Sequence, residues 1–220
     1  RKIFIGAGHS NVKGKDRGAE GNGYIEGELA VEFRDLLVQE LKKLGITPII
    51  DSNSNILSET ILKFKNLLST DCIVLDIHWN AGPVLAKGVE TLIPANSTNF
   101  ERKLAEGLSS IVSSILKTPM RGKNGVKTEA ESHHGRLGWM RLTGENVLLE
   151  TCFITNKTEM ASYEKNKHVL AKSIAKLLSE FAQDKTNTYI VVKGDTLTSI
   201  SKHTGNTISE LVSLNNLSKD

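Results

Sequence analysis

Two histidines and two glutamates of this sequence carry side chains suited to binding a metal ion or transferring a proton: His9, Glu26, His78 and Glu150. Two imidazoles and one carboxylate, with a position left open for water, are a usual ligand set of a catalytic zinc ion. A second carboxylate that is not a ligand can then act as the general base for the water. The residue types therefore point to metal-assisted hydrolysis, provided that the fold brings these positions together.

The elements that must position these residues alternate along the chain. Short apolar runs typical of strands lie at positions 2–6, 47–51, 72–77, 88–93 and 146–153. Stretches with apolar residues at helical spacing lie between most of them, and another follows the last run. This alternation predicts an α/β domain with a mostly parallel sheet and helices on both faces. Ligands of such sheets bind at the carboxyl ends of the strands, where the four residues are predicted to meet.

Helix geometry favours Glu26 over its neighbour Glu28 as the site residue. Positions 26, 29, 33 and 37 share one face of the predicted helix, which is made apolar by Leu29, Phe33 and Leu37. A carboxylate at the head of a buried face needs a compensating partner, because an unpaired buried charge is costly. A metal ion would be such a partner, whereas Glu28 falls on the polar face and is predicted to be solvated.

Each of these residues taken alone also fits a structural role. A histidine at a strand end is commonly held by hydrogen bonds, and Glu150 alone would fit a salt bridge. No HExxH pair is present to fix the geometry locally. The metal site is therefore a hypothesis that depends on the convergence of all four residues.

Three separated motifs carry a resemblance to a known family. The first comprises Gly8-His9-Ser10, the run Asp16-Arg17-Gly18-Ala19-Glu20-Gly21-Asn22-Gly23, and Glu26. The second is Asp76-Ile77-His78-Trp79-Asn80-Ala81. The third is Val147-Leu148-Leu149-Glu150-Thr151-Cys152-Phe153-Ile154-Thr155-Asn156. In this order they resemble the motifs of the zinc-dependent N-acetylmuramoyl-L-alanine amidases of family 3, over residues 2 to about 182.

The resemblance implies the zinc amidase fold and a peptidoglycan hydrolase. Such an enzyme cleaves the amide between N-acetylmuramic acid and L-alanine of the stem peptide. By motif match, His9, Glu26 and His78 would hold Zn²⁺, and Glu150 would be the catalytic acid/base. Asn80 lies two residues beyond His78 on the same strand face, so it is a candidate to support the metal site or contact substrate. A turn residue at the strand end is the alternative.

The segment 131–139 is a second candidate for substrate contact. The adjacent His133 and His134 cannot both reach one metal ion from a regular element, because neighbouring side chains point to different sides. We therefore expect them to face substrate or solvent from a loop. Arg136 is a candidate partner for a carboxylate of the stem peptide, with a solvated surface arginine as the alternative.

The chain changes character after position 182, which closes the predicted catalytic domain 1–182. The run 183–188 contains no apolar residue and is predicted to be a linker. The run Tyr189-Ile190-Val191-Val192-Lys193-Gly194-Asp195-Thr196-Leu197 resembles the start of the glycan-binding LysM module, with later matches at Leu211, Leu214, Asn215 and Asn216. We expect 189–220 to form a small truncated βααβ LysM-like module, with a first strand at 189–192 and without its last strand.

Composition and charge exclude several other classes. With 39% hydrophobic and 24% charged residues among 220, the chain is not globally disordered. Its net charge of +3 lacks the clustering of a nucleic-acid binder, and no apolar run approaches the ~20 residues of a membrane span. Cys72 and Cys152 lie in apolar runs and are expected to be buried without a disulfide. We expect a monomer that binds peptidoglycan, does not bind nucleic acid and does not insert into membranes.

Two alternatives to a catalytic amidase use the same features. A zinc peptidase would cut within the stem peptide with the same residues, and a non-catalytic wall protein would bind glycan through the LysM-like part alone. The first residues already form a strand-like run, and no signal peptide precedes them. This favours a phage endolysin, made in the host cytoplasm and released to the cell wall at lysis, over a secreted bacterial enzyme.

Overall fold

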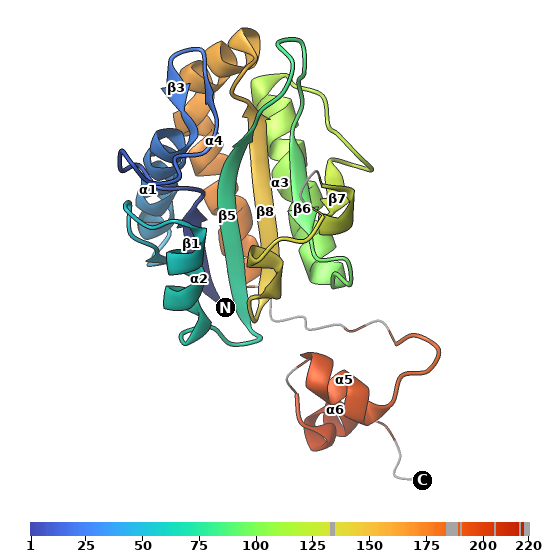
Figure 1. Cartoon of the computed structure of the whole chain (residues 1–220). Coiled ribbons are helices and arrows are strands. Elements are labelled where there is room, and N and C mark those ends of the chain that lie inside the picture. The colour runs from blue at the N-terminus through green and yellow to red at the C-terminus, as the bar shows by residue number, and fades with distance from the viewer. Residues whose placement is uncertain (133–134, 184–188, 190, 205, 216, 218–220) are drawn as a thin grey trace. The chain divides into compact units, whose positions relative to one another are not determined.

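A six-stranded sheet forms the centre of the first of two units, Arg1–Gln183, in the computed structural model (Figure 1). From one edge to the other its strands are β4 (Ile49–Ile50), β1 (Lys2–Ala7), β5 (Cys72–Asn80), β8 (Glu145–Phe153), β6 (Glu90–Ile93) and β7 (Val126–Thr128). Every neighbouring pair is parallel except β6 and β8, which are antiparallel. The prediction of a mostly parallel sheet is confirmed.

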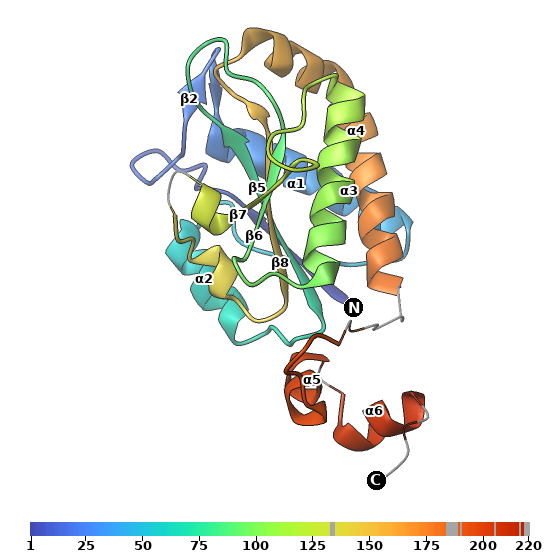
Figure 2. The same cartoon turned by 90° about the vertical axis from the view of Figure 1, so that its right-hand side faces the viewer.

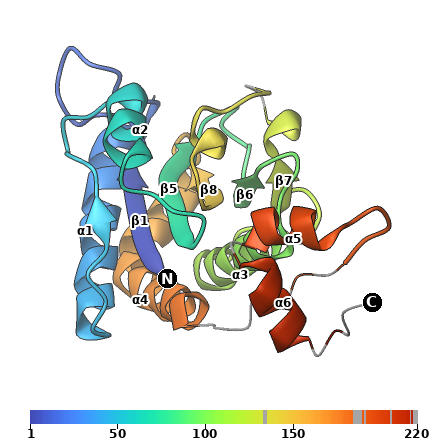
Figure 3. The same ribbon diagram turned by 90° about the horizontal axis from the view of Figure 1, so that it is seen from below.

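Helices cover both faces of this sheet, as predicted. The helices α1 (Glu26–Lys43), α3 (Asn99–Leu116) and α4 (Lys157–Gln183) bury their apolar sides in one core with the sheet. The helix α2 (Leu57–Lys65) and the short 3-10 helix η2 (Trp139–Arg141) enclose a smaller core on the opposite face. Figure 2 shows α3 and α4 side by side over one face, and Figure 3 shows α2 on the other side of the strands.

Strand alternation selects the face on which the candidate site lies. In β5, Ile73, Leu75 and Ile77 belong to the core beneath α1, α3 and α4. Cys72 and Val74 belong to the core beneath α2, so the alternation of side chains places the following even positions on the α2 face as well. Apolar packing along the first half of the strand therefore determines which side its polar second half presents.

The strands and turns near the site differ in part from the sequence-based expectation. Strand β5 extends through Asn80 and β8 through Phe153, so His78 and Glu150 lie within strands and not at their ends. The register between them shifts just after His78, where the strand pair is irregular. Additional short elements are the hairpin strands β2 (Glu20–Gly21) and β3 (Tyr24–Ile25) and the 3-10 helix η1 (Glu129–Glu131). Both cysteines are buried and free, as expected.

The second unit, Asp184–Asp220, contains the helices α5 (Leu197–Thr204) and α6 (Ile208–Leu214), which bury Ile200 and Leu211. The structure describes residues 1–132, 135–183, 189, 191–204, 206–215 and 217. The predicted strand at 189–192 is wrong for its described residues, none of which belongs to a strand, and Ile190 lies outside the description. A strand needs a hydrogen-bonded partner strand, and the described part of this unit offers none.

Asp195 instead orders the start of the second unit. Its carboxylate accepts hydrogen bonds from the Tyr189 hydroxyl and the Val192 backbone N–H, each at 2.8 Å.

Among the described helices of the whole chain, none is long and apolar enough to cross a membrane.

Candidate active site

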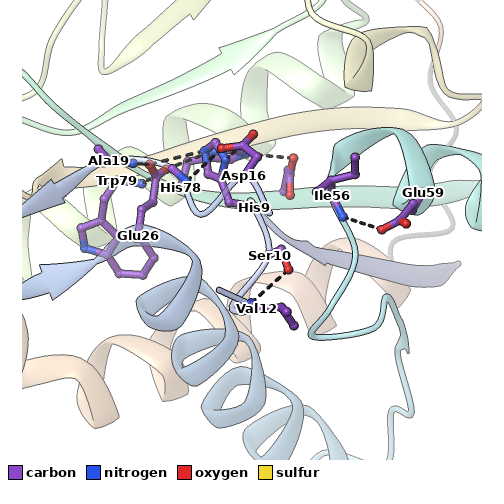
Figure 4. Close-up of polar contacts among 12 residues, drawn as sticks. His9, Ser10, Val12, Asp16, Ala19, Glu26, Ile56, Glu59, His78 and Trp79 are labelled. Atoms are coloured by element: carbon purple, nitrogen blue, oxygen red, sulfur yellow. Dashed lines mark hydrogen bonds and ion pairs between the residues drawn. The ribbon is translucent and has the colours of Figure 1, made fainter. Parts of the chain in front are cut away.

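His9, Glu26 and His78 come together from three different elements (Figure 4). His9 lies in the loop after β1, Glu26 is the first residue of α1, and His78 lies in β5. Glu26 Oε1 is 3.0 Å from His78 Nδ1, and Glu26 Oε2 is 3.4 Å from His9 Nε2. One nitrogen or oxygen atom from each residue lies within 4.8 Å of the other two, which is close enough for all three to bind one metal ion. Glu28 is exposed and pairs with Arg17, in line with its predicted place on the polar face.

Two glycines make this close approach sterically feasible. A Cβ atom at Gly8 would lie 2.4 Å from the His78 ring, and one at Gly18 would lie 2.5 Å from both Glu26 Oε2 and His9 Cδ2. Gly18 also has a positive φ of 73°, which favours glycine. His9 itself has a positive φ of 71°, an uncommon conformation for a side-chain-bearing residue that occurs preferentially at functional sites. The glycine-rich first motif is therefore needed to shape the space between the two histidines.

A carboxylate holds the outer nitrogen of each histidine. His9 Nδ1 is 3.1 Å from Asp16 Oδ2, and His78 Nε2 is 3.0 Å from Asp76 Oδ2. These contacts leave His9 Nε2 and His78 Nδ1 directed toward Glu26, the orientation that carboxylate–histidine pairs impose on metal ligands. Neither aspartate was predicted from the sequence to take part in the site. Asp76 could have been found from its position two residues before His78 on the same strand, because such residues share a face.

Charge coupling keeps Glu26 ionised although it is only 4% exposed. Burial alone would raise the pKa of this carboxyl group, but the hydrogen bonds and charges of His78 and His9 outweigh it and lower the pKa strongly. The backbone N–H groups of Trp79 and Ala19 also donate to its two oxygens, at 3.0 and 2.9 Å. Glu26 is therefore an anionic carboxylate held in place, as a cation ligand would need to be.

The two histidines show the complementary effect. Burial disfavours the charged form of His78, yet the carboxylates of Asp76 and Glu26 raise its pKa well above the usual range. Burial also disfavours the charged form of His9. Its hydrogen bond to Glu26 is the main contact that opposes this effect, and the pKa of His9 is raised overall. An imidazole can bind a metal ion only when it is neutral, so a bound cation would displace protons from these two histidines. Two nitrogens and one carboxylate oxygen fit a divalent transition-metal ion.

Glu150 lies beside this cluster but in a different environment. It is the register partner of His78 in the adjacent strand β8. Its Oε2 atom is buried and has no hydrogen-bond partner among the described residues. Burial, with smaller contributions from the charges of Glu26 and Glu90, raises the pKa of its carboxyl group to about 7. A carboxyl group of this kind can both accept and return a proton near neutral pH.

A cavity of about 990 Å³ connects the cluster with Glu150. Asn80 and Arg136 both line it. The Nδ2 atom of Asn80 donates to Glu90 Oε1 at 2.9 Å. Arg136 is exposed on the wall of the cavity, and the neighbouring His133 and His134 lie outside the described residues. Because both line the cavity, Asn80 and Arg136 remain candidates for contact with substrate.

A buried ion pair that was not predicted from the sequence anchors the loop that carries His9. Arg34 of α1 is 1% exposed and donates from Nη1 to Asp51 Oδ1 at 2.7 Å. Both carboxylate oxygens of Asp51 in turn lie 3.3 Å from the backbone nitrogen of Ala7, at the end of β1. Burial raises the pKa of Asp51, and the charge of Arg34 opposes this shift. The pair ties α1, β1 and the segment after β4 together directly behind the loop.

Comparison with known families agrees with these motifs. The family profile described as N-acetylmuramoyl-L-alanine amidase matches residues 3–180. The chain belongs to this amidase family. A second profile, described as LysM domain, matches residues 189–220. The chain is thus a peptidoglycan amidase with a C-terminal LysM domain.

Individual relatives extend over most of the amidase part. The chain is 31% identical over 163 residues to the uncharacterized protein YqiI of Bacillus subtilis strain 168, covering 72% of this chain and 73% of the relative. The crystal structure of N-acetylmuramoyl-L-alanine amidase from Clostridium difficile 630 aligns with a TM-score of 0.66 at 22% identity, covering 84% of this chain and 97% of that one. The catalytic domain of the CD27L endolysin, which targets Clostridium difficile, aligns with a TM-score of 0.60 at 23% identity, covering 85% of this chain and 99% of that one. At these identities the two structures show that the fold is shared.

Proposed function

We propose that the amidase hydrolyses the bond between N-acetylmuramic acid and L-alanine with a zinc ion held by His9, Glu26 and His78, and with Glu150 as acid/base. The observation that carries this proposal is the convergence of the three ligand atoms beside a buried, unpartnered Glu150 oxygen in one cavity. The two carboxylates have opposite pKa shifts, which suits one to bind a cation and the other to transfer protons.

The roles of the residues follow from their surroundings. When bound, zinc polarises the scissile carbonyl group and lowers the pKa of a water molecule. Asp16 and Asp76 keep the ligating nitrogens of His9 and His78 turned inward. Glu150 accepts the proton of the attacking water and passes it to the amine nitrogen as the carbon–nitrogen bond breaks. The products are the lactyl carboxylate of the sugar and the free amino group of L-alanine.

Digestion of purified peptidoglycan tests this function. We expect new L-alanine amino termini without new reducing sugar ends. New termini within the stem peptide would instead show that the chain is a peptidase, and absence of any product together with glycan binding would show a non-catalytic wall protein.

For the C-terminal part we propose a domain organisation of 1–182, a linker 183–188 and a wall-binding LysM module 189–220. Binding of glycan by the module would raise the concentration of substrate around the catalytic domain on an insoluble wall. A shortened chain ending at Ala182 should keep its metal and its rate on small soluble muropeptides, but lose binding to sedimented peptidoglycan. Equal binding by both chains at the same salt concentration would contradict this role.

We further propose that the protein acts as a monomer and as a phage endolysin, present in the host cytoplasm before lysis and then acting at the cell wall. A catalytic domain of a named endolysin shares the fold, which supports this reading. The gene sequence upstream of Arg1 tests the proposal, since a secretion signal there would assign the protein to a secreted bacterial enzyme. Light scattering of the purified chain tests the monomer.

A further inference from the structure

A carboxylate held between two cations lies on the cavity wall beyond Glu150. Glu90 of β6 is 7% exposed, and its Oε2 atom is 2.8 Å from Arg121 Nε and 2.5 Å from Lys127 Nζ. Its other oxygen accepts the hydrogen bond from Asn80. Burial would raise the pKa of Glu90, but the two cations outweigh it and lower the pKa, so the residue stays charged. The cluster of Glu90, Arg121 and Lys127 therefore carries one net positive charge.

Arg121 and Lys127 keep hydrogen-bond donors that no described residue uses. Arg121 donates from Nε to Glu90 and makes a long contact of 3.4 Å from Nη1 to the Lys87 carbonyl, while its Nη2 atom has no partner in the described part of the chain. The guanidinium carbon lies 4.9 Å from the centre of the Phe153 ring, a cation–π contact that restricts the position of the group. Both cations line the same cavity as Glu150.

The order of the strands places this cluster on the far side of Glu150 from the histidines. His78 on β5 pairs with Glu150 on β8, and Glu150 pairs with Glu90 on β6. Register partners have their side chains on the same face, so the metal cluster, the acid/base and the cationic cluster follow one another across the sheet. In the proposed mechanism the amine leaves beside Glu150. The stem peptide that continues from this amine would therefore extend past Glu150 toward the cationic cluster.

We propose that Arg121 and Lys127 form a subsite that binds a free carboxylate of the stem peptide on the leaving-group side of the scissile amide. This inference rests on the proposed function and names the part of its substrate that the site recognises. A planar guanidinium with unused donors suits a carboxylate, and one carboxylate balances the net charge of the cluster. Glu90 acts as a positioning residue that holds the two cations together.

Carboxylate recognition belongs to Arg121 and not to Arg136, although both line the cavity. Arg121 is oriented by Glu90 and Phe153, so little side-chain freedom is lost when a ligand binds. Arg136 is exposed and has no such partners among the described residues.

A pair of soluble muropeptides tests the subsite with the full-length, metal-loaded protein. One has a free carboxylate on the residue that follows L-alanine, and the other carries a carboxamide at that carboxylate. We expect a KM about tenfold lower for the carboxylate peptide, the size of one charge-assisted hydrogen bond at a partly exposed site. Arg121→Gln should remove this difference by raising KM for the carboxylate peptide, with the effect in KM and not in kcat.

Lys123→Gln is the matched control, since it removes a cation from an exposed position outside the cavity two residues away. It should leave the difference between the two peptides intact. If Arg121→Gln does not fold by circular dichroism, Lys127→Gln provides the same comparison and should also raise KM for the carboxylate peptide.

Cleavage of both peptides with equal KM by the unaltered protein would overturn the subsite alone. A rise in KM for Arg136→Gln without one for Arg121→Gln would overturn the assignment to this wall of the cavity. Failure to release an L-alanine amino terminus from either peptide would overturn the proposed function, and the subsite with it.

Discussion

Two glutamates beside opposite halves of strand β8 have a pKa raised to about 7: Glu150 in the carboxyl-terminal half of the strand, and Glu101 of α3 beside its amino end. Of the two, Glu150 alone lines the cavity. At the carboxyl end, Glu150 has one oxygen without a hydrogen-bond partner among the described residues. At the amino end, Glu101 is 3% exposed, and its oxygens accept hydrogen bonds from the backbone of Asn146 at 2.7 Å and of Thr98 at 2.8 Å. Burial is the main cause of the shift in both cases.

The difference between the two ends is the reason why Glu150 is proposed as the catalytic carboxyl group and Glu101 is not. Glu101 uses its oxygens to cap α3 and to fix the start of β8, so a substrate proton has no access to it. Glu150 has an unused oxygen, a neighbouring cluster of metal-ligand type and space for a substrate. A shifted pKa therefore indicates a functional site only together with access and a free lone pair.

Loss of a metal-binding residue is expected to have the largest effect on activity. It should affect the role of Glu150 and not that of Glu101. His78→Ala should remove the bound metal and reduce the rate by more than the ~10²–10⁴-fold expected for an acid/base residue, because two ligands make a poor site. Chelation of the unaltered protein should have the same result, with recovery on addition of zinc. Metal content by mass spectrometry checks it, and Glu28→Ala serves as control. Stoichiometric metal in His78→Ala would refute the ligand assignment.

The carboxylate behind His78 is expected to have the next largest effect. Asp76→Asn keeps the size of the side chain but removes the negative charge that orients and polarises the imidazole. We expect metal affinity to fall about 10–100-fold, the usual cost of losing such a partner. Competition with a fluorescent chelator measures this, and unchanged affinity would show that Asp76 only fills space.

The pH dependence of activity should report Glu150 and not Glu101. The base must be deprotonated, so kcat/KM should fall about tenfold per pH unit below its pKa. That pKa is about 7 without metal, and a bound dication would lower it, so the decline should begin at or below about pH 7. Metal content measured at each pH separates this effect from loss of metal. A rate that stays flat down to about pH 5 with the metal retained would contradict a Glu150 base.

The smallest effect on activity is expected at the amino end. Glu101→Gln should keep kcat/KM within about twofold, because Glu101 lies outside the cavity. The glutamine amide has one acceptor oxygen in place of two, so one of the two backbone hydrogen bonds is lost, which lowers the unfolding free energy by about 1–3 kcal/mol. The folded-state pKa of Glu101 is above the unfolded value of about 4.3, so its protonated form stabilises the fold, and that contribution disappears as pH rises through about 7. Urea unfolding should therefore show a shallower loss of stability from about pH 5 to 8 in Glu101→Gln than in the parent. An equal slope in both would contradict the assignment of this pKa.

The main elements of the fold could be predicted because they leave strong local patterns. Apolar runs such as those of β5 and β8 and the buried stripe of α1 set the sheet, the covering helices and the burial of Glu26. The short strands β2, β3 and β7 have two or three residues each, too few to produce a periodic signal. The described residues of the strand expected at 189–192 do not form a strand, because apolar residues form one only with a partner strand.

The candidate site was predictable only in part, for a related reason. His9, His78 and Glu150 follow or interrupt apolar runs, so their positions relative to the strands could be inferred from sequence. Glu90, Arg121 and Lys127 come together only because β6 pairs with β7 and β8. Such pairing between distant segments cannot be inferred from the spacing of residues in the sequence. The buried Arg34–Asp51 pair is likewise formed by tertiary contact alone.

Two neighbouring carboxylates in one cavity are proposed to have different roles, Glu26 as a metal ligand and Glu150 as the acid/base. The most direct measurement is the zinc content and the turnover of Glu150→Gln, made in parallel with Glu26→Gln. We expect Glu150→Gln to retain stoichiometric zinc and to lose about 10²–10⁴-fold in rate, whereas Glu26→Gln should lose both zinc and rate. Loss of zinc from Glu150→Gln, or full zinc in Glu26→Gln, would contradict these roles.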